Sequence, residues 1–230
     1  MSAVAPERVA FFDVDGTLVS RNIWKGVVAY PGISRMSRYR FYTRALPGML
    51  GYLSKRIPED SFRDDFIRQM AGLFTGWSQA AVLDLFAWVV NGYMSGFYRE
   101  DVVARLREHL ENGDQVVLVS NMFQEGIQAF ADYLGADTAI GTRLTYRDGI
   151  CQGRVVGESC AGPRKVDFIH EYLTERRFAV QLADCYAYAD SVSDQHLLGA
   201  VGQPTAVYPD AGLRTLAQER GWAILPMPAS

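Results

Sequence analysis

The chain has 230 residues, of which 49% are hydrophobic and 21% are charged, the usual balance of a globular protein. This composition excludes a disordered chain, a collagen-like repeat and a small disulfide scaffold. With 23 basic and 26 acidic residues the formal net charge is −3, so no basic excess marks the whole chain as a nucleic-acid binder.

The cysteines and the hydropathy pattern predict the cellular location of the protein. Cys151, Cys160 and Cys185 are odd in number and widely spaced, which is typical of reduced thiols in a cytosolic protein. Residues 1–10 contain no long apolar segment and are not expected to be a secretory signal. The longest apolar stretch, residues 80–90, contains Asp84 and is too short to span a bilayer. The sequence therefore predicts a soluble cytoplasmic protein without a membrane partner.

The first element in chain order is a strand at residues 9–12. These residues are wholly apolar and are followed at once by Asp13, as in a buried strand that runs into a loop. A continuous apolar strand of this kind usually lies in a parallel sheet that is covered on both faces. The first strand is therefore expected at the centre of an α/β core.

Residues 20–98 interrupt the core. They show helical periodicity without a convincing strand, and Pro-Gly pairs punctuate them. This segment holds ten basic and five acidic residues, a net charge of +5, whereas the rest of the chain has a net charge of −8. We expect a helical cap over residues 20–98, inserted between core segments 1–19 and 99–230, with hinges near residues 19–21 and 98–101.

After residue 98 the strands and helices alternate. Further strands are predicted at 116–119, 185–189 and 205–208, and helices at 102–110, 124–134 and 163–175. The alternation predicts an α/β fold with a doubly wound parallel sheet. Residues 143–156 differ, because two β-like runs flank Asp148-Gly149, a signal for a two-residue hairpin turn. A β-hairpin is predicted there, extending the edge of the core.

Polar residues follow three of the predicted strands. Asp13 and Asp15 come after the first strand, and Ser120 and Asn121 come after the second. Because ligands of open parallel sheets bind beyond the carboxyl ends of the strands, these side chains are expected to converge. The other candidates are Asp190 and Asp194, which follow the third strand, and Lys165, at the start of a helix, with Arg164 as a rival.

Four carboxylates at one site repel one another unless a cation neutralises them. Oxygen ligands without histidine or cysteine favour Mg²⁺, with Asp13 and Asp190 as direct ligands and a backbone oxygen of Asp15 as a third. Lys165 and Ser120 would neutralise and bind a phosphate group on that metal. An aspartate held in line with phosphorus can act as a nucleophile, and Asp15 can serve as the acid and base.

These residues resemble the four ordered motifs of the haloacid-dehalogenase-superfamily hydrolases. The motif residues are Asp13-Val-Asp15-Gly-Thr-Leu, Leu118-Val-Ser120-Asn, Lys165 and Asp190-Ser-Val-Ser-Asp194. The resemblance is to subfamily IB, the phosphoserine-phosphatase-like branch, which carries a helical cap between the first and second motifs. It implies that Asp13 is the nucleophile and a Mg²⁺ ligand, and that Asp15 is the acid and base and coordinates through its carbonyl. It further implies that Ser120, Asn121 and Lys165 bind phosphate and that Asp190 and Asp194 bind the metal.

The sequence also departs from the phosphoserine enzymes. Those enzymes carry serine where Gly16 stands and Gly-Gly where Asn121-Met122 follows Ser120. The glutamate that reads the substrate amine, nine residues after the nucleophile, is replaced by Asn22. A neutral amide offers an ammonium group no counter-charge, so the expected phosphatase is not clearly specific for phosphoserine.

The predicted cap supplies further expectations. Most arginines of the helix predicted near residues 33–46 are expected to face solvent, and one of Arg35 and Arg38 is the candidate that could reach the site. The cap aromatics are expected to form its core: Trp24, Tyr30, Phe41, Trp77, Phe86 and Trp88.

The sequence predicts a Mg²⁺-dependent phosphatase that hydrolyses a small phosphomonoester through an aspartyl-phosphate intermediate. Its expected partner is a small phosphorylated metabolite, not a nucleic acid, and its oligomeric state is not predicted. Two alternatives stay open: a phosphotransferase to an alcohol acceptor, and a catalytically silent module that uses the cap to bind a partner. A hydrolytic dehalogenase is disfavoured, because Asp15 and the metal cluster have no role in displacing a halide.

Overall fold

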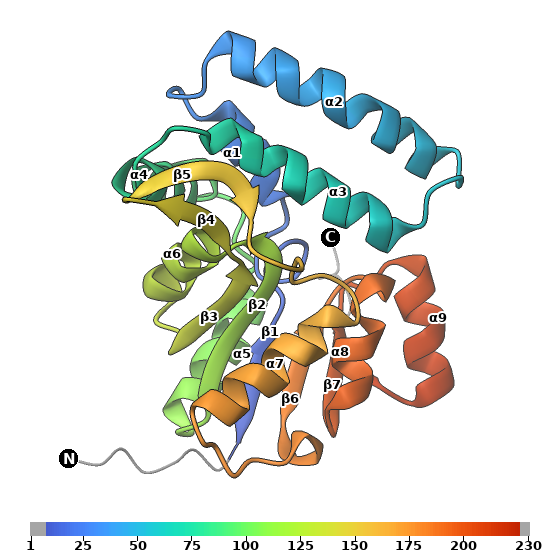
Figure 1. Cartoon of the computed structure of the whole chain (residues 1–230). Helices are drawn as coiled ribbons and strands as arrows, with labels where there is room; N and C mark the ends of the chain where they lie inside the picture. Colours follow the sequence, from blue (N-terminus) through green and yellow to red (C-terminus); the bar gives the residue numbers. More distant parts are fainter. Residues whose placement is uncertain (1–7, 226–230) are drawn as a thin grey trace, which may run out of the picture.

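A six-stranded parallel sheet forms the centre of the molecule (Figure 1). The structure, a computed structural model, describes residues 8–225. The strands are β1 (Val9–Phe12), β2 (Gln115–Phe123), β3 (Thr138–Thr142), β6 (Tyr186–Ala189), β7 (Gln203–Val207) and β8 (Ala223–Leu225). Their order is β3-β2-β1-β6-β7-β8. Strands β1 to β3 are added toward one edge of the sheet and β6 to β8 toward the other, so the topological switch point lies between β1 and β6. The carboxyl ends of those two strands therefore border the crevice in which ligands of such sheets bind.

The four residues of β1 alternate between two hydrophobic cores, which explains their unbroken apolar run. Val9 and Phe11 pack among residues of α7 (Arg164–Glu175), α8 (Gln195–Ala200) and α9 (Ala211–Arg220). Ala10 and Phe12 pack on the other face, against α5 (Glu100–Glu111) and α6 (Gln124–Leu134). Full burial of each phenylalanine contributes about 1.5–3 kcal/mol, so β1 is held firmly from both sides. The predicted doubly wound α/β core is confirmed.

The segment between β1 and α5 is helical, as predicted, and lies over the carboxyl ends of the strands (Figure 1). Its elements are α1 (Ile23–Ala29), α2 (Arg35–Leu53), α3 (Glu59–Ala71), a 3₁₀ turn η1 (Gly72–Phe74), α4 (Gln79–Trp88) and a π turn η2 (Val89–Tyr93). The chain enters and leaves this segment side by side, because Ser20 donates its backbone N–H to the carbonyl of Phe97 at 2.8 Å.

The last part of this helical segment packs closely on the core. Phe86 of α4 is fully buried and lies 6.5 Å from the ring of Phe123, at the end of β2. A side chain at Gly126 of α6 would collide with the Phe86 ring, so glycine permits this contact. One hydrophobic core therefore continues from the sheet into the helical segment.

The hairpin forms at the predicted residues, but the expectation that it extends the edge of the core sheet was wrong. Strands β4 (Leu144–Arg147) and β5 (Ile150–Val155) make a separate two-stranded sheet. Cys151 of β5 donates its backbone N–H to the carbonyl of Trp77 at 2.8 Å, so the hairpin pairs with the helical segment. The reason is geometric: one residue separates β3 from β4, and the chain continues past the carboxyl edge of the sheet instead of turning back along its side.

Other differences lie at strand ends. Strands β3 and β8 were not predicted; β3 contains glycine and β8 has three residues, so neither has the long apolar run that marks a buried strand. Strand β2 runs to Phe123, beyond the predicted end, with a register shift after Val119. The division into core and cap stays a prediction, and residues 1–7 and 226–230 of the predicted core lie outside the described residues. The same holds for most of residues 1–10, which were not expected to form a secretory signal. In the described part of the chain, no helix has the length and apolarity needed to cross a bilayer.

Candidate active site

Asp13 lies directly beyond β1 and is almost fully buried. Its backbone N–H donates to the carbonyl of Tyr188 in β6 at 2.9 Å, which continues the β1–β6 pairing by one residue. One carboxylate oxygen, Oδ1, lies 2.6 Å from Nζ of Lys165, and Oδ2 accepts a hydrogen bond from the Thr17 hydroxyl at 3.3 Å. Both oxygens of Asp13 are therefore held in fixed positions at the switch point of the sheet.

Three predicted metal ligands meet at this point. Asp13, Asp190 and Asp194 each offer a carboxylate oxygen, and these atoms all lie within 4.8 Å of one another. Lys165 also contacts Oδ1 of Asp194 at 2.6 Å, so its ammonium bridges two of the three acids. Gly16, which replaces the serine of the phosphoserine enzymes, adopts φ +86°, and a Cβ at this position would collide with Asp190.

Burial sets the charge state of this cluster. It raises the pKa of Asp13 above its ordinary value, although the Lys165 ammonium opposes the shift. Burial, together with the carboxylates of Asp13 and Asp194, raises the pKa of Asp190 to about 8. Burial disfavours the charge on Lys165, but the facing carboxylates of Asp13 and Asp194 outweigh it and raise its pKa. Without a cation the cluster therefore retains protons near neutral pH, and a divalent cation would displace them.

Asp15 lies beside the cluster in a different environment. Its Oδ1 accepts a hydrogen bond from the backbone N–H of Ile23 at 2.6 Å, which ties it to the start of α1. Burial raises the pKa of Asp15 to about 7, although this backbone hydrogen bond lowers it in part. A carboxyl group with such a pKa can release and accept a proton near neutral pH, as an acid and base must.

The phosphate-binding candidates Ser120 and Asn121 occupy the irregular part of β2. Ser120 is buried, and its hydroxyl accepts a hydrogen bond from the backbone N–H of Met122 at 3.3 Å. The carbonyl of Asn121 accepts from the Thr142 hydroxyl at 2.7 Å, and its side-chain amide donates to the carbonyl of Arg63 at 3.4 Å. Register shifts of this kind redirect side chains. Here the Asn121 side chain reaches the backbone of α3 in the cap segment.

The structure brings together all seven residues that the sequence assigned to catalysis, phosphate binding and metal binding. One cavity is lined by Asp13, Asp15, Ser120, Asn121, Lys165, Asp190 and Asp194. Arg164, the rival of Lys165, instead faces solvent and pairs with Glu158 at 3.5 Å. Burial against two acids therefore distinguishes Lys165 from Arg164, whereas in the sequence only motif spacing favours Lys165.

Arg63 of α3 also lines this cavity and was not predicted. Its Nη2 pairs with Oε1 of Glu59 at 2.7 Å. Neither Arg35 nor Arg38 lines this cavity, because α2 lies outside α3 (Figure 1) and Arg38 donates to the carbonyl of Tyr30 at 2.8 Å. Arg35 is exposed, as expected for most arginines of this helix. No sequence motif marks Arg63, since a Glu–Arg pair four residues apart is common on solvated helices.

Asp210 is a second unpredicted residue of the cavity. Its Oδ2 accepts from the backbone N–H of Val192 at 2.9 Å and its Oδ1 from that of Leu213 at 2.8 Å. It thereby caps α9 and holds the loop that carries Asp190 and Asp194. A signal existed, because Asp210 follows the fourth predicted strand as the other acids follow theirs.

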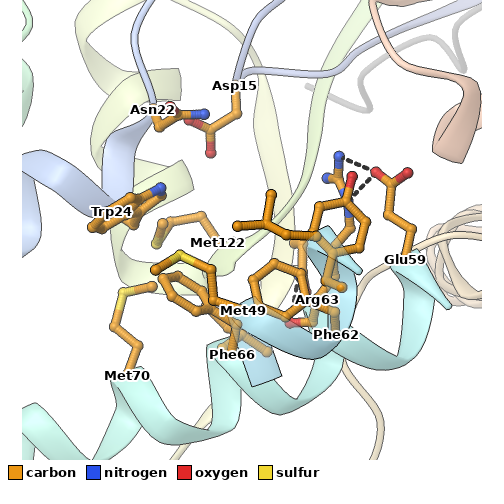
Figure 2. Close-up of a pocket in the computed structure, with 14 residues that line it drawn as sticks. Asp15, Asn22, Trp24, Met49, Glu59, Phe62, Arg63, Phe66, Met70 and Met122 are labelled. Carbon is orange, nitrogen blue, oxygen red and sulfur yellow. Dashed lines mark hydrogen bonds and ion pairs between the residues drawn. The ribbon is translucent and has the colours of Figure 1, made fainter. Parts of the chain in front are cut away.

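A second cavity, of about 320 Å³, adjoins the first. The two share four lining residues: Asp15, Asn22, Arg63 and Asn121. The aromatics predicted to form the core of the cap differ in their burial and in whether they line this cavity. Phe41 and Phe86 are buried, as predicted, whereas Trp24 is partly buried and lines the second cavity (Figure 2).

Comparisons with known proteins identify the family. The family model described as haloacid dehalogenase-like hydrolase matches residues 10–199. The chain belongs to this family. It is 32% identical over 219 residues to a phosphoserine phosphatase of Mycobacterium tuberculosis, which covers 94% of this chain and 69% of that protein.

Solved structures agree with this hydrolase fold. A Bordetella pertussis Tohama I protein of unknown function matches with a TM-score of 0.81 and 27% identity, over 96% of this chain and 98% of that chain. A substrate-bound phosphoserine phosphatase complex matches with a TM-score of 0.64 and 17% identity, over 95% and 92%, which shows the shared fold. The prediction of a haloacid-dehalogenase-type phosphatase, similar to the phosphoserine-phosphatase-like branch, is confirmed at the level of family and enzyme class.

Proposed function

We propose that this hydrolase uses Mg²⁺ and Asp13 to cleave a small phosphomonoester through an aspartyl-phosphate intermediate. The observation that carries the proposal is the position of Asp13, buried at the switch point of the sheet, in contact with Lys165 and beside two further acids. A nucleophile for phosphoryl transfer needs such positioning, because catalysis of this reaction is mostly placement and charge stabilisation.

The residues present fit a Mg²⁺ ion. Asp13, Asp190 and Asp194 offer hard oxygen donors within 4.8 Å of one another, and the cluster retains protons when no cation is bound. A bound Mg²⁺ would neutralise charge on the phosphate during transfer. Lys165 would contribute a second positive charge, and Ser120 and Asn121 would hold the remaining phosphate oxygens.

The proposed reaction has two steps. In the first, a carboxylate oxygen of Asp13 attacks phosphorus, the bond from phosphorus to the leaving oxygen breaks, and protonated Asp15 donates its proton to that oxygen. In the second, ionised Asp15 accepts a proton from water, whose oxygen attacks the phosphorus, and the bond to Asp13 breaks. The products are an alcohol and inorganic phosphate, and Asp15 again carries its proton. Its pKa of about 7 suits both roles.

The substrate is proposed to be a small phosphorylated metabolite, and phosphoserine is not favoured. The relative from Mycobacterium tuberculosis is named a phosphoserine phosphatase. In this chain, however, Asn22 lines both cavities, at the position where the phosphoserine enzymes carry their amine-binding glutamate. Free, buried thiols at Cys151, Cys160 and Cys185 support the proposed cytoplasmic location.

The decisive experiment replaces the nucleophile. We expect Asp13→Asn to lower kcat for p-nitrophenyl phosphate with Mg²⁺ by about 10³-fold or more, because an amide oxygen cannot form the intermediate. Asp84→Asn, at an exposed position of α4, is the matched control and should retain full activity. Phosphate release by Asp13→Asn at the normal rate would remove Asp13 as the nucleophile.

The same assay separates the alternatives. Product analysis with an added alcohol distinguishes transfer to that alcohol from hydrolysis. Any turnover that requires Mg²⁺ excludes a silent binding module, and loss of turnover in EDTA tests the metal.

A further inference from the structure

The cavity that adjoins the acid cluster, here called the side pocket, has mainly apolar walls. We propose that the side pocket binds an apolar alkyl or aryl group of the substrate, so that the enzyme prefers phosphomonoesters of apolar alcohols or phenols. The inference rests on the proposed phosphatase function and deepens it. The residues that carry it are Trp24, Met49, Phe62, Phe66, Met70 and Met122.

The position of Asp15 places the leaving group in the side pocket. Asp15 lines both cavities, with the acid cluster in one and the apolar walls in the other. A substrate whose phosphorus lies at Asp13 in the first cavity can therefore extend its organic group past Asp15 into the side pocket. Figure 2 shows Asp15 and Asn22 at one end of the side pocket and Phe66 and Met70 at the other. The organic group therefore points toward the apolar end.

The charges of the side pocket do not favour a charged organic group. Its cation, Arg63, is already paired with Glu59, with Nη2 and Oε1 2.7 Å apart (Figure 2). Asn22 is neutral. A substrate carboxylate or ammonium that entered would lose its water and meet no unmatched charge deeper in the side pocket, which is costly. An apolar group would lose nothing of this kind.

The apolar walls are adaptable and partly preformed. Met70 and Met122 are almost fully buried, and the flexible thioether side chain of methionine fits ligands of different shape. The rings of Trp24 and Phe66 meet edge to face, 5.4 Å apart. Met49 of α2 is 39% exposed and forms part of the wall, so the side pocket opens to solvent along an apolar side. A longer alkyl chain can therefore follow α2 outward.

The test is a series of n-alkyl phosphates from ethyl to octyl, assayed with Mg²⁺ by phosphate release. The alcohols of this series have nearly the same leaving-group reactivity, so differences in kcat/KM report contacts of the chain. We expect kcat/KM to rise up to about fourfold for each methylene that enters the side pocket. Glycerol phosphate and phosphoserine should be poorer substrates than butyl phosphate.

Variants locate the effect. Met70→Gln and the more exposed Met49→Gln should each lower the ratio of kcat/KM for hexyl to ethyl phosphate several-fold. The ratio, unlike the rate itself, does not fall when a variant folds incompletely. Leu83→Gln is the control, because Leu83 is an apolar residue of α4 that is 46% exposed and does not line the side pocket. It should leave the ratio unchanged.

The outcomes separate the two proposals. A flat alkyl series, or a preference for phosphoserine over butyl phosphate, overturns the apolar side pocket while the phosphatase function stands. A rising series that Met70→Gln and Met49→Gln leave intact also overturns the assignment to this cavity. Failure to release phosphate from any ester, p-nitrophenyl phosphate included, overturns the proposed function and the inference with it.

Discussion

Lys165 shows how burial distinguishes two adjacent cations. Its ammonium is enclosed between Asp13 and Asp194, at 2.6 Å from an oxygen of each. Arg164 precedes it by one residue, on a different side of α7, and its ion pair with Glu158 is exposed. A buried charge that loses its partner has no water to replace it, whereas an exposed charge does.

Removal of the two side chains should therefore have unequal effects. We expect Lys165→Met to lower the free energy of unfolding by about 3–5 kcal/mol in EDTA, because two buried carboxylates lose their counter-charge. Arg164→Met should cost about 0–1 kcal/mol. Urea unfolding of both variants measures the difference. Equal losses for the two variants would contradict the structural role given to Lys165.

At the scale of elements, the β4–β5 hairpin and the loop after it make hydrogen bonds to the helical segment. Strand β5 bonds to the turn that precedes α4, and Arg68 of α3 donates to the carbonyl of Gly157 at 2.9 Å. Gly153 of β5 adopts φ +67°, and a Cβ there would collide with the Thr75 hydroxyl. The hairpin can therefore approach η1 only because this residue has no side chain.

A glycine pair tests that contact. We expect Gly153→Ala to destabilise the protein by more than Gly157→Ala, because both residues have positive φ but nothing lies within 4 Å of a Cβ at Gly157. The backbone strain alone should cost about 1–2 kcal/mol, and the collision with Thr75 adds to it. Thermal unfolding of the two variants gives the comparison. If Gly157→Ala proved the more damaging change, the hairpin contact would not carry the stability assigned to it.

At the scale of the whole molecule, the acid cluster links stability to pH and to metal. Asp15 and Asp190 have pKa values of about 7 and 8, raised mainly by burial, against ordinary values near 4 in the unfolded chain. The folded protein therefore binds more protons than the unfolded chain between these values. The contribution to stability is fully present below about pH 4 and is lost as the pH rises through 7 to 8.

In EDTA we therefore expect the Tm to fall between pH 5 and pH 8 by more in the natural protein than in Asp190→Asn, which lacks one of these groups. Mg²⁺ should raise the Tm at pH 8 more than at pH 5, because it competes with protons for the same oxygens. Differential scanning fluorimetry with and without Mg²⁺ measures both effects. Identical pH profiles for the two proteins would show that Asp190 does not titrate as described.

Much of the site could be predicted from the chain alone. The polar residues beyond β1 and β6 and in the last part of β2 were expected to converge, and they do, because the carboxyl ends of parallel strands must meet at one edge of their sheet. Arg63 could not be predicted in this way. It reaches the cavity from a helix whose distance from the core is set by packing, and its local sequence resembles that of any solvated helix.

The amino-acid order by itself determined the parallel core, the helical insertion after the first strand and the acids at the strand ends, because short-range apolar patterns and the geometry of parallel strands decide these features. Only the tertiary structure decided where the hairpin packs, which arginine enters the cavity, how far the acids hold their protons, and that an apolar pocket adjoins Asp15. These features depend on burial and on contacts between segments far apart in the chain, which no local pattern encodes.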